Sequence, residues 1–82
     1  MAKIGIEYCV ECMFLGRALE IAKVLLEQFP QQIDSLELIP GTDGVFLITL
    51  AGEPVYRIGA DGKLPAPEEI RRRLESRLRM HA

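Results

Sequence analysis

The sequence predicts an α/β fold, with a four-stranded mixed sheet and two helices in the order β-α-β-β-β-α. Three observations carry this prediction. Apolar residues alternate in several short segments, which is typical of strands, and they recur every three or four residues in two longer segments, which is typical of helices. The only two cysteines, Cys9 and Cys12, lie where the first strand pattern changes to the first helix pattern. With 82 residues, the chain suffices for a single domain over residues 1–82 with one hydrophobic core.

The first strand is predicted over residues 3–8. Ile4, Ile6 and Tyr8 alternate with more polar or smaller residues and would share one face of the strand. Gly5 lies on the opposite face, where its missing side chain would allow another element to pack closely above the strand.

A helix is predicted over residues 13–29. Pro30 ends it, because proline cannot donate a backbone hydrogen bond and restricts the residue before it. The apolar residues of this segment form one stripe: Phe14, Ala18, Ile21 or Ala22, Leu25 and Phe29.

Three further strands are predicted over residues 33–39, 45–50 and 55–58. The first of them follows a helix, so a right-handed crossover should make it parallel to the strand at residues 3–8. The segment 45–50 is almost continuously apolar, which predicts an internal strand covered on both faces and antiparallel to the first strand. A short turn joins it to the last strand, where Pro54 and Arg57 are typical of a sheet edge.

The last helix is predicted to begin at Pro67. Acidic residues fill its first turn and arginines its last, as the helix dipole favours. Favourable four-residue pairs are expected between Glu68 and Arg72 and between Glu69 and Arg73. Its apolar stripe is narrow: Ile70, Leu74 and Leu78.

The composition excludes several classes of function. A net charge of −2 gives no overall field that would attract nucleic acid, and we interpret the arginines of the last helix (Arg71, Arg72, Arg73, Arg77 and Arg79) as a solvated face. No apolar run approaches membrane length and no signal peptide is recognisable, so we expect no membrane partner. Two cysteines this close together cannot brace a small secreted fold, which favours the cytoplasm.

The Cys-x-x-Cys motif predicts a thiol redox site with Cys9 and Cys12 as the catalytic residues and with no metal or cofactor. Two intervening residues allow the sulfurs to meet in a disulfide, and thiolates attack disulfides. A helix N-terminus would favour the thiolate, whereas Glu7 and Glu11 would oppose it. Arg17 would favour the thiolate if its side chain folded back. Two alternatives remain: inert thiols, or half of a zinc site. Zinc needs about four ligands, and beyond the pair only His81 or a second chain offers them.

The order of elements, with Cys-x-x-Cys after the first strand, matches a thioredoxin-like core. The chain also resembles the selenoprotein W-like (Rdx) family, as a cysteine-containing bacterial-type member, over almost its whole length. The matching pieces are Ile6-Glu7-Tyr8-Cys9-x-x-Cys12, Phe14, Arg17-Ala18, Phe29-Pro30, Leu38-Ile39-Pro40-Gly41, Gly44-Val45-Phe46 and Gly62-x-x-Pro65. The sequence departs from the family pattern at Leu47 and Leu64.

The resemblance implies a thiol oxidoreductase or antioxidant role, with glutathione as a co-substrate or a protein as the partner. In relatives that contain selenium, the selenium takes the position of Cys12, and on this ground we predict Cys12 as the residue that forms mixed disulfides. In thioredoxin-like proteins the N-terminal thiol of the motif is the more exposed one and becomes the thiolate, which favours Cys9 instead. Cys12 would lie one turn into the helix and would be the more buried thiol. Pro40 precedes a strand, where thioredoxin-like proteins often have a cis-proline, but an ordinary trans proline is the commoner case.

A second class of function is a redox-sensitive protein-binding module with negligible turnover. Tyr8 and Phe14 flank the cysteines and could form an apolar rim for a partner, although Phe14 also suits the core. No histidine or other acid–base residue accompanies the motif, which keeps this alternative open beside the oxidoreductase.

Overall fold

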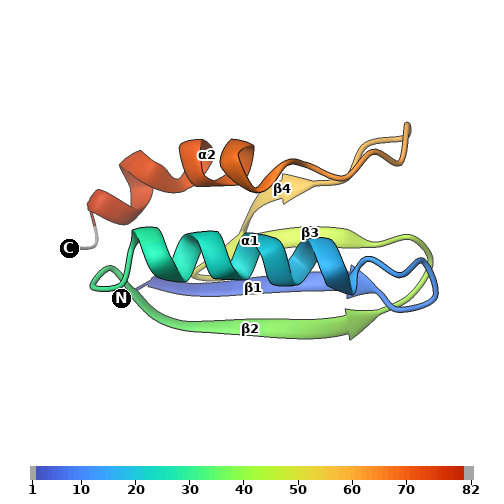
Figure 1. The fold of residues 1–82 in the computed structure, drawn as a ribbon, viewed down its shortest axis with the longest axis horizontal. Helices are drawn as coiled ribbons and strands as arrows, with labels where there is room; N and C mark the ends of the chain where they lie inside the picture. Colours follow the sequence, from blue (N-terminus) through green and yellow to red (C-terminus); the bar gives the residue numbers. More distant parts are fainter. Residues whose placement is uncertain (1, 81–82) are drawn as a thin grey trace.

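The computed structural model describes residues 2–80, which form four strands and two helices in the predicted order (Figure 1). The elements are β1 (Ala2–Cys9), α1 (Leu15–Gln28), β2 (Ile33–Gly41), β3 (Phe46–Leu50), β4 (Glu53–Arg57) and α2 (Pro67–Arg79).

The four strands form one mixed sheet in the order β2-β1-β3-β4. β1 is parallel to β2 and antiparallel to β3, and β3 and β4 form an antiparallel hairpin. The prediction of an internal third strand, antiparallel to the first, is therefore confirmed. In β4, Pro54 and Arg57 are exposed at the edge of the sheet, as predicted.

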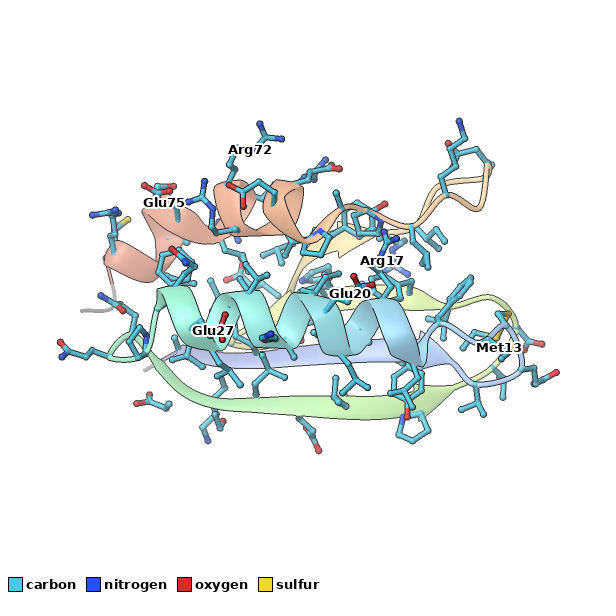
Figure 2. The ribbon with its side chains drawn as sticks, in the orientation of Figure 1. Met13, Arg17, Glu20, Glu27, Arg72 and Glu75 are labelled. Atoms are coloured by element: carbon cyan, nitrogen blue, oxygen red, sulfur yellow. A yellow bond between two sulfur atoms is a disulfide. The ribbon has the colours of Figure 1, made fainter. Side chains whose placement is uncertain are left out.

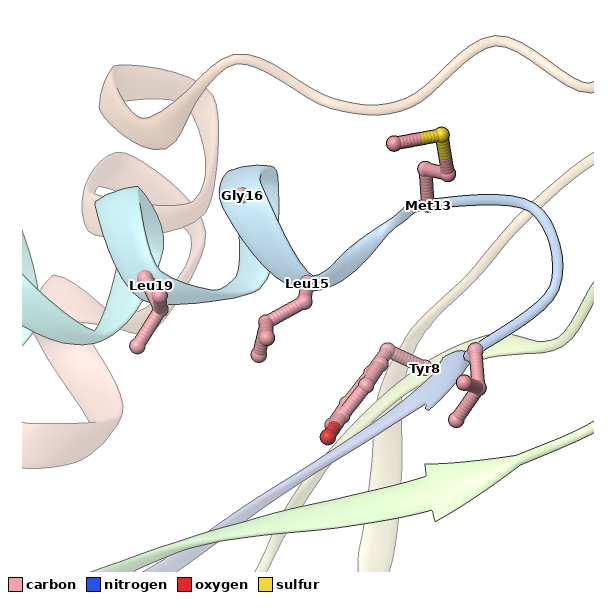
Figure 3. Close-up of a pocket in the computed structure, with 6 residues that line it drawn as sticks. Tyr8, Met13, Leu15, Gly16 and Leu19 are labelled. Carbon is pink, nitrogen blue, oxygen red and sulfur yellow. The ribbon is translucent and has the colours of Figure 1, made fainter.

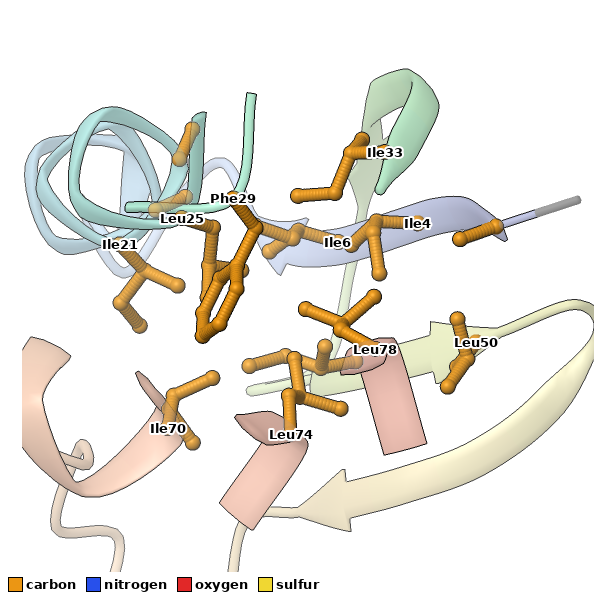
Figure 4. Packing of buried hydrophobic residues seen from close by; sticks show 14 of the residues in the cluster. Ile4, Ile6, Ile21, Leu25, Phe29, Ile33, Leu50, Ile70, Leu74 and Leu78 are labelled. Carbon is orange, nitrogen blue, oxygen red and sulfur yellow. The ribbon is translucent and has the colours of Figure 1, made fainter. Parts of the chain in front are cut away.

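The hydrophobic core lies between one face of the sheet and the two helices. Ile4 of β1 stands opposite Leu36 on one side and Leu50 on the other, so these three side chains share a face. Both helices cover this face and pack against each other (Figures 1 and 4). The largest fully buried side chains are Phe46, Ile6, Ile21, Leu25, Ile48, Ile70, Leu74 and Leu78.

Within residues 2–80 the opposite face of the sheet carries no helix, which corrects two predictions. Leu47 and Thr49 of β3 point to this face and are only half-buried, so β3 is not covered on both sides. No element packs above Gly5 either. A Cβ atom at Gly5 would instead lie 2.8 Å from Thr49 Oγ1 of the neighbouring strand. Gly5 therefore makes room within the sheet rather than for another layer.

Two element boundaries differ from the predictions near the cysteines. α1 begins at Leu15 rather than at residue 13, and Phe14 is its N-cap residue. β2 continues to Gly41, so Pro40 lies in the strand and pairs with Tyr8 instead of starting the turn. Within residues 2–80 no peptide bond is cis, so Pro40 is the commoner trans form.

α2 begins at Pro67, as predicted, and buries the expected stripe. The predicted pair of Glu69 with Arg73 is present at 3.2 Å. The predicted pair of Glu68 with Arg72 is wrong, because Glu68 lies 2.6 Å from Arg71. Arg71 also binds Glu75 at 2.7 Å, one turn further along, so it joins two carboxylates.

Candidate redox site

The cysteines lie in the loop of residues 10–14 and at the strand end that precedes it. Cys9 is the last residue of β1, the strand at the centre of the sheet, and it pairs with Gly41 of β2. Its backbone N–H donates to the carbonyl of Val45 over 2.8 Å, and the N–H of Val10 donates to the carbonyl of Gly41 over 3.1 Å. Backbone hydrogen bonds to residues on both sides of the turn between β2 and β3 therefore fix the start of the loop.

The two sulfurs lie within disulfide distance, as the spacing of the motif predicts, and the Cα atoms are 5.3 Å apart. The backbone N–H of Cys12 donates to Sγ of Cys9 over 3.3 Å. The disulfide lies at the end of the molecule where Figure 2 labels Met13. Its closure needs only the short loop and no movement of the sheet.

The exposure of the two cysteines is the reverse of what we predicted. Cys9 is 1% exposed, whereas Cys12 is an exposed residue. The prediction placed Cys12 one turn into the helix, but α1 begins only at Leu15, so Cys12 lies in the loop. Cys9 is buried at the end of an inner strand, where the backbone of Gly41 and Val45 closes around the start of the loop. An incoming thiol or disulfide therefore meets Cys12 first.

The loop turns without a glycine. Met13 adopts a left-handed backbone with φ 61°, a conformation that costs free energy for residues other than glycine. Two hydrogen bonds close the turn, from the N–H of Met13 to the carbonyl of Val10 (3.1 Å) and from the N–H of Phe14 to the carbonyl of Cys9 (3.3 Å). This geometry leaves the side chain of Met13 86% exposed.

Arg17 does not fold back toward the cysteines. Its Nη1 donates to the carbonyl of Pro65 over 2.8 Å, and its Nε lies 3.2 Å from Glu20 (Figure 2). The side chain therefore ties α1 to the segment that precedes α2, and its charge is engaged there.

Within residues 2–80 no three histidine, cysteine, aspartate or glutamate side chains are placed to hold a metal ion. His81, the other natural ligand in the sequence, lies outside the described residues. In the same part of the chain, neither helix is long and apolar enough to cross a membrane.

An apolar hollow of about 390 Å³ adjoins the loop, and we call it the Leu19 groove (Figure 3). In Figure 3, Leu15 and Leu19 point to the same side of α1, with Tyr8 near them at the end of β1. Several of its apolar residues are well exposed: Val10 (54%), Met13 (86%), Leu15 (41%) and Leu19 (50%). The residues that line the groove are Tyr8, Val10, Met13, Leu15, Gly16 and Leu19.

Of the two residues predicted to form an apolar rim, Tyr8 lines the groove but is also buried with the core. Phe14 packs its ring edge-on against Phe46, with the centroids 6.0 Å apart, and so belongs with the core. Leu15 and Leu19 were not predicted, although their four-residue spacing, outside the buried stripe of the helix, is a visible signal of a second apolar face.

Comparison with known proteins agrees with this geometry. The model of the Rdx family matches residues 3–76. A crystal structure of a protein from Bordetella parapertussis is similar, with 34% sequence identity and a TM-score of 0.85 over 93% of this chain and 96% of that one. A selenoprotein W-related protein from Vibrio cholerae is 27% identical, with a TM-score of 0.86 over 94% of this chain and 96% of the other.

No curated protein sequence matches the chain. The two structures confirm the predicted thioredoxin-like fold over nearly the full length of each chain. The family match covers the strand end, the Cys-x-x-Cys loop and all six elements up to the last turn of α2. With its two cysteines at disulfide distance in that loop, this chain belongs to the Rdx family.

Proposed function

We propose that the protein exchanges thiols and disulfides through Cys9 and Cys12, as an oxidoreductase or antioxidant. The observation that carries the proposal is the pairing of a buried and an exposed cysteine at disulfide distance, one at the end of β1 and one in the loop that follows. An exposed sulfur can bond to an outside partner, while a buried neighbour can displace that partner without leaving the protein.

In the reduced protein, the thiolate of Cys12 attacks a substrate disulfide R–S–S–R′. A bond forms between Cys12 and the R sulfur, the substrate S–S bond breaks, and R′S⁻ leaves and takes up a proton. The thiolate of Cys9 then attacks Sγ of Cys12 and releases RS⁻, which is also protonated. Two electrons pass from the cysteines to the substrate, which leaves as two thiols, and the protein keeps the disulfide.

The reverse reaction regenerates the dithiol with electrons from an external dithiol. One thiolate of that reductant attacks Sγ of Cys12, the exposed cysteine, so the S–S bond breaks with Cys9 as the leaving group. The second thiolate of the reductant then attacks the reductant sulfur bonded to Cys12, which closes the reductant's disulfide and releases Cys12 as a thiolate. The N–H of Cys12, 3.3 Å from Sγ of Cys9, stabilises the negative charge that develops there. Both directions thus pass through a mixed disulfide on Cys12, the residue predicted from the family resemblance.

The substrate is glutathione disulfide or a disulfide of a partner protein, and we propose the cytoplasm as the compartment. A thiol pair of this kind cycles where thiols are kept reduced.

The polarity is tested with the variants Cys9→Ser and Cys12→Ser, each treated with excess oxidised glutathione and followed by mass spectrometry. Cys9→Ser should accumulate a glutathione adduct on Cys12, because the resolving thiol is missing. Cys12→Ser should react poorly, because Cys9 is buried. An adduct that accumulates on Cys9 alone would make Cys9 the nucleophile.

The wild-type protein provides the control. It should lose both free thiols to an intramolecular disulfide without forming dimers. If both thiols survive the treatment, the redox function is wrong.

The exposed apolar side chains around the loop favour a second function, a redox-sensitive protein-binding module with negligible turnover. Turnover of insulin or peroxide coupled to a dithiol reductant, together with a reduction potential, separates the two. A stable mixed disulfide without turnover would support the binding module.

A further inference from the structure

We propose that the Leu19 groove binds an extended apolar segment of a partner protein, and that this segment carries the disulfide exchanged at Cys12. This inference rests on the redox function proposed above and names the substrate class: protein disulfides with apolar neighbours, in preference to glutathione.

The first argument is the concentration of exposed apolar surface at one place. Single exposed apolar residues are ordinary on a protein surface, but a hollow lined by several of them marks an interaction site. Here Val10 and Met13 lie on either side of Cys12 in the sequence, and both are more than half exposed. Leu15 and Leu19 continue the apolar surface along the first turns of α1. Two residues that line the groove therefore flank Cys12 in the same short loop.

Gly16 is the second argument. A glycine within a helix costs up to about 1 kcal/mol relative to alanine. Nothing in the fold requires it, because a Cβ atom built at Gly16 would meet no atom within 4 Å, and its φ is not in the left-handed region. Gly16 lines the Leu19 groove, and its missing side chain leaves space for a backbone to approach the helix closely.

The third argument is charge. Neither lysine nor arginine lines the groove, and Glu11 is the one charged residue of the loop. Arg17, one turn away, is engaged by Glu20 and the carbonyl of Pro65. Each glutathionyl unit carries two carboxylates and one ammonium group, so its net negative charge finds no cation here and is repelled by Glu11. A neutral apolar segment carries no net charge, so Glu11 does not repel it.

The dimensions suit an extended segment. Leu15 and Leu19 are four residues apart, which is about 6 Å along the helix axis. Two residues of an extended chain span about the same distance, and their alternate side chains point to one side. A segment with apolar residues at two alternate positions beside its cysteine therefore matches the two leucines.

The test uses the reduced full-length protein and three mixed disulfides with thionitrobenzoate. Their thiol halves are the capped peptides Cys-Ala-Leu-Ala-Leu and Cys-Ala-Glu-Ala-Glu, and glutathione. The Cys12 thiolate attacks the probe sulfur and expels coloured thionitrobenzoate, and Cys9 then releases the probe thiol. Each rate is divided by that of the same probe with N-acetylcysteine amide, which removes differences in intrinsic reactivity.

The normalised rate of the leucine probe should exceed the other two by about tenfold, which is the gain expected from burying part of one or two leucine side chains. Leu19→Lys should remove most of this advantage and speed the reaction of the glutathione probe. Gly16→Leu should slow the leucine probe by filling the groove.

Leu26→Lys is the matched control. Leu26 is 45% exposed on the same helix, does not line the groove and lies about 10 Å from Leu19 along the axis, where a new charge is largely screened. Its rates should equal those of the wild type. Equal normalised rates for all three probes, or equal effects of the two lysine variants, would overturn the docking proposal and leave the redox function standing. If no probe releases thionitrobenzoate, the redox function itself is wrong.

Discussion

Phe46 links the redox loop to the core at the scale of a single side chain. It is fully buried, and its ring receives the edge of Phe14, the residue that ends the loop and caps α1. Tyr8, which lines the Leu19 groove, stands opposite Phe46 in the sheet. The position of the loop therefore depends on an aromatic residue of β3, outside the Cys-x-x-Cys motif.

We expect Phe46→Ala to lower the free energy of unfolding by about 3–5 kcal/mol, as for other large buried aromatic residues. Urea denaturation of the reduced protein measures this loss. Leu47→Ala, on the uncovered face of the same strand, serves as the control and should cost clearly less, because Leu47 is only half-buried. Equal losses of free energy would show that the two faces of β3 do not differ in burial as they do in the structure.

The exposure of Cys9 and Cys12 could not be predicted from the residues alone. Which sulfur is buried depends on where α1 begins and on the backbone contacts that Gly41 and Val45 make with the loop. These contacts come from residues about 30 positions away, and local periodicity carries no information about them. The Cys-x-x-Cys spacing, by contrast, predicted the disulfide correctly because that geometry is local.

At the scale of elements, α2 combines a narrow buried stripe with a network of ion pairs on its exposed side. Arg71 contacts Glu68 and Glu75, and Glu75 also contacts Arg79 at 3.1 Å. The hydrogen bond from Arg71 is the main cause that lowers the pKa of Glu68 from its ordinary value of 4.5. The ionised form of Glu68 is therefore favoured in the folded state.

This shift predicts a pH dependence. Because the folded-state pKa of Glu68 is the lower one, its contribution to stability is present above the unfolded value of 4.5 and is lost as the pH falls through the folded value. In the Arg71→Gln variant, the urea midpoint should fall less steeply as the pH decreases below 4.5. The effect should be small, since surface pairs contribute little. Arg72→Gln is the control, as Arg72 forms no ion pair within residues 2–80, and an equally large change there would contradict the assignment to Arg71.

Periodicity predicted the existence and order of every element, including Pro67 at the start of α2 and the hairpin of β3 and β4. It did not predict that both helices cover the same face. The apolar stripe of a helix shows that the helix needs a sheet, but it does not specify which side of the sheet it meets. The apolar run of residues 45–50 therefore suggested cover on both faces, where Leu47 and Thr49 have none from a helix.

At the scale of the whole molecule, the disulfide and the core are nearly independent. Cys12 lies outside the core, and the loop closed by the bond spans a sequence separation of only 3. The core side chains come from the sheet and both helices, so the fold does not need the bond to hold its layers together.

We therefore expect the reduced protein to remain folded and to unfold as one unit. Reduction should lower the free energy of unfolding by no more than about 2 kcal/mol, since a disulfide that closes so short a loop removes little entropy from the unfolded chain. Urea denaturation with and without a reductant measures the difference. Loss of the fold on reduction would contradict this, and it would also exclude a redox cycle between two folded forms.

The central place of β1 has a consequence for how the protein is made. β1 precedes both of its sheet neighbours in the chain, and the carbonyls that hold its end belong to Gly41 and Val45. During synthesis Cys9 and Cys12 thus emerge from the ribosome well before the strands that bury Cys9. The two sulfurs, three positions apart, can already react with each other at that stage. The nascent chain has two nearly equivalent thiols, and only the finished sheet makes one of them the resolving thiol.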